Sequence, residues 1–142
     1  MAGQQHQRVL VIDDDADVRR MLIAALRRKS LLIDEASDGG EAIELLNTNH
    51  YAVVLLDLLM PNVDGFGVID SMQESATPPI LLVVSGADRE ILADVKSPKV
   101  HAILKKPFDA AEVADVVSAC AEIRGRIDGP PPEGDRPRTV LQ

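Results

Sequence analysis

Short apolar runs recur along this chain, and each is followed by a stretch with a different, helix-like pattern. The clear runs are apolar throughout, which is typical of strands that are buried on both faces of a parallel sheet. Because such runs alternate with helical stretches, the chain is limited to a layered α/β structure. The runs cover residues 9–12, 31–33, 52–56, 80–84 and 100–104.

Apolar residues return at helical spacing between these runs, and they predict a helix after each strand. Two of the helices begin with capping-box spacing, Asp38 to Glu41 and Asp109 to Glu112. The predicted fold is therefore α/β, a (βα)5 doubly wound structure whose five-stranded parallel sheet carries helices on both faces. The predicted helices cover about residues 18–26, 38–46, 64–74, 88–95 and 109–125. In the last of them, one face is expected to carry Val113, Val116, Val117 and Cys120.

The length of 142 residues fits one domain. We expect a polar N-terminal extension over residues 1–7 and the domain over residues 8–125. Residues 126–142 are rich in proline and glycine and show neither a helical nor a strand period. They predict a disordered tail or the start of a linker.

Composition excludes several classes of protein. A net charge of −8 and an aromatic content of 2% argue against direct contact with nucleic acid, which needs basic surfaces and stacking side chains. No apolar run reaches the roughly 18 residues of a membrane span, and the N-terminus is too polar and short for a signal peptide. The single cysteine, Cys120, suits a reducing compartment. We therefore expect a cytoplasmic protein without a membrane segment.

Polar residues follow the apolar runs, and this placement carries the chemistry. Taken singly, each of them is most often a turn or cap residue. In a parallel α/β sheet, however, the carboxyl ends of all strands lie at one edge, where ligands bind. The residues are Asp13, Asp14 and Asp15 after the first run, Asp57 after the third, Ser85 after the fourth, and Lys105 and Lys106 after the fifth.

Three carboxylates that lie close together repel each other unless a cation lies between them. Asp13, Asp14 and Asp57 with Lys106 would leave an excess of two negative charges, which one divalent ion balances. Hard oxygen ligands of this kind suit Mg²⁺. The same set could transfer a phosphoryl group, because a carboxylate can attack phosphorus while the lysine and a hydroxyl stabilise the phosphoryl oxygens.

These residues stand in motifs that resemble those of the response-regulator receiver domains. The resemblance covers about residues 8–124, and its motifs together are highly specific. They are Val-Leu-Val-Ile-Asp13-Asp14-Asp, Leu-Leu-Asp57-Leu-Leu-Met60-Pro61 followed by Asp64-Gly65, Val-Val-Ser85-Gly86, and Lys106-Pro107-Phe108. One departure is Ile103, where the family often has tyrosine or phenylalanine. Another is Ser97-Pro98-Lys99-Val100, where members commonly have a Gly-Ala turn.

The resemblance implies a flavodoxin-like, stand-alone switch similar to the chemotaxis regulators of bacterial two-component systems. Asp57 would accept a phosphoryl group from the phosphohistidine of a histidine kinase or a phosphotransfer protein. Asp13 and Asp14, with Asp57 and the backbone carbonyl of Leu59, would hold Mg²⁺. Lys106 would contact the phosphoryl oxygens, and Ser85 would respond to them. Output would pass to a downstream protein, in an oligomeric state that the sequence does not specify.

Two other functions remain open at this stage. The chain could be a receiver-like interaction module that is never phosphorylated, although the intact acid set favours a switch. It could also be a hydrolase that forms an aspartyl phosphate. Such enzymes typically carry a second acid two residues after the nucleophile, and Leu59 occupies that position here. We therefore expect no enzyme activity beyond Mg²⁺-assisted self-phosphorylation and self-dephosphorylation.

Overall fold

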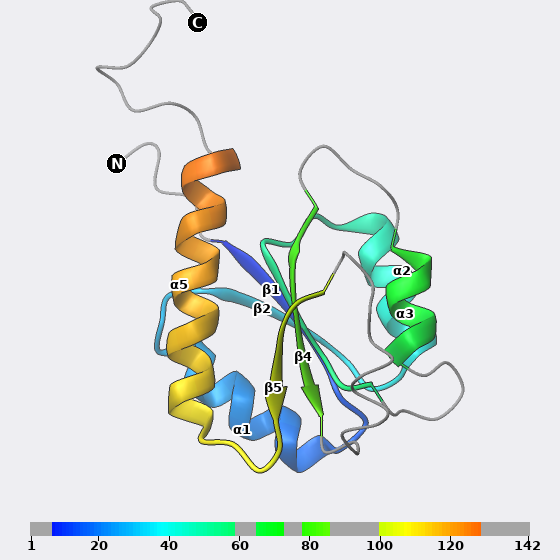
Figure 1. Cartoon of the computed structure of the whole chain (residues 1–142), viewed down its shortest axis with the longest axis horizontal. Coiled ribbons are helices and arrows are strands. Elements are labelled where there is room, and N and C mark those ends of the chain that lie inside the picture. Colours follow the sequence, from blue (N-terminus) through cyan, green and yellow to red (C-terminus); the bar gives the residue numbers. More distant parts are fainter. Residues whose placement is uncertain (1–6, 59–64, 73–77, 86–99, 129–142) are drawn as a thin grey trace, which may run out of the picture.

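A computed structural model describes residues 7–58, 65–72, 78–85 and 100–128. Five parallel strands form one sheet in the order β2-β1-β3-β4-β5 (Figure 1). The doubly wound α/β prediction is therefore confirmed. The strands are β1 (Arg8–Ile12), β2 (Leu32–Ala36), β3 (Val53–Leu56), β4 (Ile80–Ser85) and β5 (Val100–Lys105).

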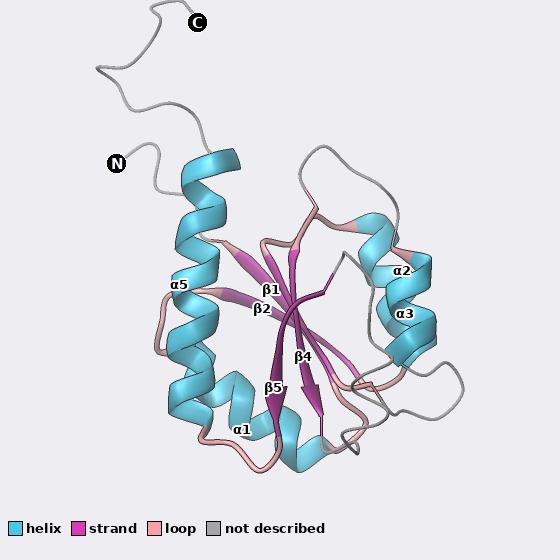
Figure 2. Ribbon diagram, in the orientation of Figure 1, coloured by secondary structure: helices cyan, strands magenta, loops and turns pink. Residues whose placement is uncertain are grey.

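The described helices cover both faces of this sheet. One face carries α1 packed against α5, and the other carries α2 packed against α3 (Figure 2). The helix predicted over residues 88–95 lies outside the described residues. None of the helices among the described residues is long and apolar enough to cross a bilayer. The bounds are α1 (Ala16–Arg27), α2 (Gly39–Thr48), α3 (Gly65–Ser71) and α5 (Ala110–Asp128).

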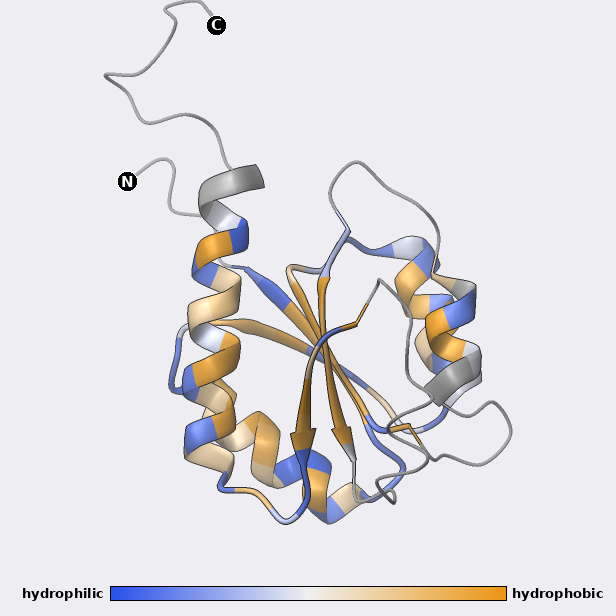
Figure 3. Ribbon diagram, in the orientation of Figure 1, coloured by the Kyte–Doolittle hydropathy of each residue, from blue (hydrophilic) through white to orange (hydrophobic). Residues whose placement is uncertain are grey.

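Two apolar cores lie on the two faces of the sheet. Since successive strand residues point to opposite faces, Val9 and Val11 join the core under α1 and α5, whereas Leu10 and Ile12 join the core under α2 and α3. The inner strands β1, β3 and β4 are accordingly the most continuously apolar strands of the sheet (Figure 3). This double burial explains why their runs show no alternation, whereas the edge strands β2 and β5 are partly exposed.

Both predicted capping residues begin their helices. Asp38 accepts a hydrogen bond from the Glu41 backbone N–H at 2.8 Å, and the Glu41 carboxylate accepts one from the Ser37 N–H at 2.7 Å. Asp109 accepts a bond from the Ala111 N–H at 2.8 Å. These bonds satisfy backbone donors that the first helical turn leaves without partners.

Three helical predictions need correction. Helix α3 ends at Ser71, earlier than the predicted residue 74. Helix α5 continues to Asp128, beyond the end that we placed at residue 125, because Gly129-Pro130 is the first strong helix stop after its capping residue Asp109. Val116 is 39% exposed, since the buried stripe of α5 runs through Val113 and Val117, from which Val116 is rotated away.

His101 interrupts the fifth apolar run, and the structure has a β-bulge at this residue. The register between β4 and β5 shifts so that Leu81 pairs with Val100 and Leu82 pairs with Ala102, which leaves His101 as the extra residue. The Nδ1 atom of His101 accepts the Leu81 N–H at 3.0 Å. The ring therefore replaces a backbone acceptor that the bulge removes from the ladder.

A polar cluster lies at the end of the sheet where β1 begins. The Tyr51 hydroxyl donates to Asp34 at 2.7 Å, and Arg8 pairs with the same carboxylate at 3.0 Å. Tyr51 is 2% exposed. Burial, followed by the bond to Asp34 and the charge of Asp34, raises the pKa of the tyrosine above its ordinary value of 10.0. The contribution of this bond to stability is complete below pH 10 and is lost as the pH rises through the raised pKa.

We expect Tyr51→Phe to lower the free energy of unfolding by about 1–2 kcal/mol at pH 7, because the variant leaves a half-buried carboxylate without one of its donors. Urea denaturation measures the change. Thr48→Val is the control, since it removes an exposed hydroxyl whose described bonds are all local, to the Glu44 and Leu45 carbonyls and from the Asn49 side chain. Equal stabilities for Tyr51→Phe and the parent protein would contradict the proposed contribution.

Candidate functional site

Two of the predicted acids directly follow neighbouring strands and are held by the sheet. Asp13 follows β1, and its N–H donates to the Ala36 carbonyl at 3.2 Å. Asp57 follows β3, and its N–H donates to the Ile12 carbonyl at 2.9 Å. Their exposures of 2% and 7% make them the two buried charged residues of the described core. The sheet therefore places two acids side by side in a poorly solvated position.

Asp14 completes an acid cluster from the solvent side. It is exposed, yet carboxylate oxygens of Asp13, Asp14 and Asp57 all lie within 4.8 Å of one another. Like charges at this separation, two of them buried, are costly without a cation. The donor set consists of oxygen atoms alone, with one side open to water. It fits a hard divalent cation that keeps part of its hydration shell, as Mg²⁺ does.

Lys106 approaches the cluster from the end of β5. Its Nζ lies 3.2 Å from Asp13 Oδ2 and 3.5 Å from Asp57 Oδ2. Burial lowers the pKa of Lys106, but the charges of Asp13 and Asp57 outweigh it, so that the pKa is raised above 10.5. The ammonium group is therefore protonated at neutral pH. Lys105, the preceding residue, is exposed.

The third aspartate of the first motif has a different role. Asp15 is the N-cap of α1, and its Oδ1 accepts bonds from the backbone N–H groups of Asp17 at 2.9 Å and Val18 at 3.2 Å. Its own N–H donates to Asp13 Oδ1 at 3.0 Å. Asp15 thus begins the helix and orients Asp13, and its carboxylate belongs to the helix cap.

Ser85 and Leu59 are only partly placed by the structure. Ser85 is the last residue of β4 and pairs in the ladder with Lys105, so its backbone lies at the same edge of the sheet as Lys106. Its side chain is not described, and Leu59 lies outside the described residues. The roles that the resemblance assigns to these two residues stay predictions.

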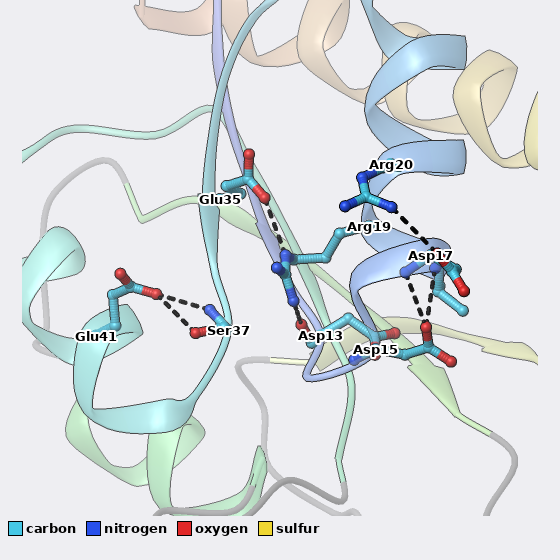
Figure 4. A network of polar contacts seen from close by, with 9 residues as sticks. Asp13, Asp15, Asp17, Arg19, Arg20, Glu35, Ser37 and Glu41 are labelled. Atoms are coloured by element: carbon cyan, nitrogen blue, oxygen red, sulfur yellow. Dashed lines mark hydrogen bonds and ion pairs between the residues drawn. The ribbon is translucent and has the colours of Figure 1, made fainter.

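One contact residue of the site was missed by the sequence analysis. The guanidinium group of Arg19 donates to the main-chain oxygen of Asp13 at 2.7 Å and to Glu35 at 2.9 Å (Figure 4). In sequence, Arg19 is one of several arginines between the apolar positions of α1. Its place in the first turns of the helix that follows the acid motif is the signal that could have found it.

Known proteins share these motifs and this fold. A family model described as the response regulator receiver domain matches residues 9–118. The transcriptional regulatory protein SrrA of Staphylococcus aureus is 39% identical over 112 residues, which are 78% of this chain and 46% of SrrA. The chain therefore spans about half the length of the curated relatives that it matches.

Solved structures agree with this match. The Francisella response regulator 1452 receiver domain has a TM-score of 0.74 and 26% identity, with 83% of this chain and 98% of that chain covered. A CheY-like receiver domain from Methanospirillum hungatei JF-1 has a TM-score of 0.78 and 16% identity over 87% and 99% of the two chains, and it shows the fold alone. TrrA of Thermotoga maritima, solved in complex with Mg(2+)-BeF, likewise shows the fold, with a TM-score of 0.70 and 24% identity over 80% and 98%.

The flavodoxin-like topology and the resemblance of the sequence motifs are confirmed together by these matches. With more than half of its length matched by the family model, this chain belongs to the response regulator receiver domain family.

Proposed function

We propose that Asp57 accepts a phosphoryl group from the phosphohistidine of a histidine kinase or phosphotransfer protein, and that the chain is a switch that acts by protein contact. The observation that carries this proposal is the convergence of Asp13, Asp14, Asp57 and Lys106 at one edge of the sheet. Membership of a family of signalling domains supports it.

In the proposed transfer, a carboxylate oxygen of Asp57 attacks phosphorus while the bond from phosphorus to the histidine nitrogen breaks. The electron pair of that bond goes to the imidazole, and Asp57 becomes an acyl phosphate. Lys106, within 3.5 Å of Asp57, is close enough to neutralise charge that develops on the phosphoryl oxygens. Ser85, which ends β4, would donate a hydrogen bond to the same oxygens.

The donor set supports a magnesium ion in this site. Asp13, Asp14 and Asp57, with the backbone carbonyl of Leu59, would hold it, and TrrA is a fold relative that was solved with Mg(2+)-BeF. When bound, the ion would supply positive charge that offsets the repulsion between the acids and the incoming phosphoryl group. The protein itself contributes the alignment, through the sheet bonds of Asp13 and Asp57.

The output is proposed to pass through the end of the sheet near β4 and β5. A phosphoryl group on Asp57 would recruit Ser85, which ends β4, and Lys106, which follows the neighbouring strand β5. Ile103 of β5 is 39% exposed at the position where the family often has an aromatic ring. A side chain branched at Cβ has few rotamers, so we propose a response without an aromatic switch, carried by about residues 87–99, which lie outside the described residues.

The partner of this output is proposed to be a protein, because a net charge of −8 opposes direct binding to a phosphate backbone. SrrA is named a transcriptional regulatory protein, but more than half of its length has no counterpart in this chain. The role in transcription that this name states is therefore not transferred to the chain.

Incubation with acetyl phosphate and Mg²⁺, followed by intact mass spectrometry, tests the function. We expect a gain of one phosphoryl group that requires Mg²⁺ and is lost at alkaline pH. An unchanged mass would indicate the interaction module that is not phosphorylated. Continuous hydrolysis of acetyl phosphate without a stable mass gain would indicate the aspartyl-phosphate hydrolase.

A further inference from the structure

The Arg19 side chain bridges two elements that flank the acid cluster. Its Nη1 donates to the Asp13 main-chain oxygen at 2.7 Å, and its Nε donates to Glu35 Oε1 of β2 at 2.9 Å (Figure 4). The side chain is 15% exposed, whereas Glu35 is 53% exposed. A mostly buried guanidinium group that donates to a backbone oxygen differs in kind from a surface ion pair, which contributes little to stability.

The atom that Arg19 holds belongs to the peptide group between Asp13 and Asp14. Because that group is planar, fixing its oxygen also fixes the direction in which the chain enters Asp14. The other atoms of Asp13 are held as well, since Oδ1 accepts from the Asp15 N–H and Oδ2 pairs with Lys106. Arg19 therefore acts on the backbone that carries two acids of the cluster, without using their carboxylate oxygens.

Glu35 sets the direction of this contact. The guanidinium group is a rigid planar fork, so a bond from Nε to Glu35 constrains where Nη1 can point. Glu35 pairs with Val11 in the β1–β2 ladder, close to the end of β1 from which Asp13 follows. The link thus runs from an edge strand through one side chain to the turn that carries the acids.

We propose that Arg19 is a positioning residue, held by Glu35, which preforms the Asp13–Asp14 backbone for cation binding. The inference rests on the metal site proposed above. Its alternative is that Arg19 acts through charge alone. The two ideas predict opposite signs, because loss of a positive charge beside an acid cluster tightens cation binding, whereas loss of a positioning bond weakens it.

The test is Mg²⁺ affinity by titration calorimetry at fixed ionic strength, for the full chain and four variants. Arg19→Ala should weaken binding about tenfold. Arg20→Ala is the matched control, since Arg20 is the next residue and pairs with Asp17, with both side chains at least 79% exposed. It should bind Mg²⁺ as tightly as the parent or slightly more tightly.

Two further variants separate geometry from charge. Arg19→Lys keeps the charge but lacks the planar fork. On a logarithmic scale, its Mg²⁺ affinity should therefore fall about half as far as that of Arg19→Ala. Glu35→Gln keeps an oxygen acceptor and should weaken Mg²⁺ binding only about twofold.

Hydrogen exchange tests the positioning role in the metal-free protein. The Asp15 amide hydrogen should exchange several-fold faster in Arg19→Ala, because Asp13, which accepts the hydrogen bond of this amide, is less well held.

The results distinguish a positioning role of Arg19 from an effect of its charge alone. Parental or tighter Mg²⁺ binding by folded Arg19→Ala and Arg19→Lys would overturn the positioning role and leave the proposed site intact. A parent protein with no measurable Mg²⁺ affinity would instead reject the metal site, and the positioning role with it. If Arg19→Ala does not fold, weakened binding by Arg19→Lys supports the inference and parental binding overturns it.

Discussion

Asp57→Asn is expected to gain no phosphoryl group under conditions that phosphorylate the parent protein completely. The amide nitrogen and oxygen of asparagine are poor nucleophiles toward phosphorus, and no acyl phosphate can form. We expect the rate of modification to fall at least about 1,000-fold, to the detection limit of intact mass spectrometry. Asp17→Asn is the control, because Asp17 is an exposed acid in the first turn of α1.

The same substitution should have opposite effects on stability in the absence and presence of Mg²⁺. Without the ion, removal of one of two buried like charges should raise the free energy of unfolding by about 1–2 kcal/mol, although one contact of Lys106 is lost. With saturating Mg²⁺, the parent gains stability by mass action and the variant gains less. Thermal unfolding with EDTA and with Mg²⁺ measures both effects. Destabilisation of Asp57→Asn in EDTA would contradict the argument from repulsion.

Lys106→Met is expected to be the most destabilising single change in the site. The variant keeps the length of the side chain but leaves Asp13 and Asp57 without the ammonium group that lies 3.2 Å and 3.5 Å away. Removing one member of a buried charge pair costs about 3 kcal/mol. Phosphorylation by acetyl phosphate should slow about 100-fold, since charge on the phosphoryl oxygens is no longer neutralised.

The contribution of Lys106 to stability should fall as the pH rises. Its pKa is raised above 10.5, so its stabilising contribution is complete below that value and disappears as the pH rises through the raised pKa. The stability difference between the parent and Lys106→Met should therefore be lost only in strong alkali, as far as this group is concerned. Lys105→Met is the matched control, because Lys105 is adjacent and exposed. Equal losses of stability in the two variants would contradict the role assigned to Lys106.

The acids of the first motif show what a sequence can and cannot assign. Asp13, Asp14 and Asp15 are identical in side chain and consecutive, and no spacing pattern separates the first two from the third. In the structure, Asp15 caps α1, whereas Asp13 and Asp14 lie with Asp57. Whether an aspartate caps a helix or joins a site depends on the direction of the backbone where the strand ends, and composition does not record that direction.

Arg19 and His101 show a second limit. Each serves a backbone atom outside its own helix or strand. Arg19 donates to the Asp13 carbonyl, and His101 accepts from the Leu81 N–H. Neither interaction leaves a spacing pattern, because it satisfies a polar group that becomes available only when strands and helices have packed. In the sequence, Arg19 is one of several arginines between apolar helix positions, and His101 is a polar residue within an apolar run.

The sequence by itself determined the inner strands, the capped starts of two helices and the layered α/β class, because burial on both faces of a parallel sheet and the hydrogen bonds of a first helical turn impose local patterns. It also named the acids and the lysine, since polar residues that end buried strands meet at one edge. Only the tertiary structure decided which oxygens lie within 4.8 Å of one another, how near Lys106 lies to them and which arginine holds their backbone. Those relations depend on distances between strands that are far apart in the chain, and packing alone sets such distances.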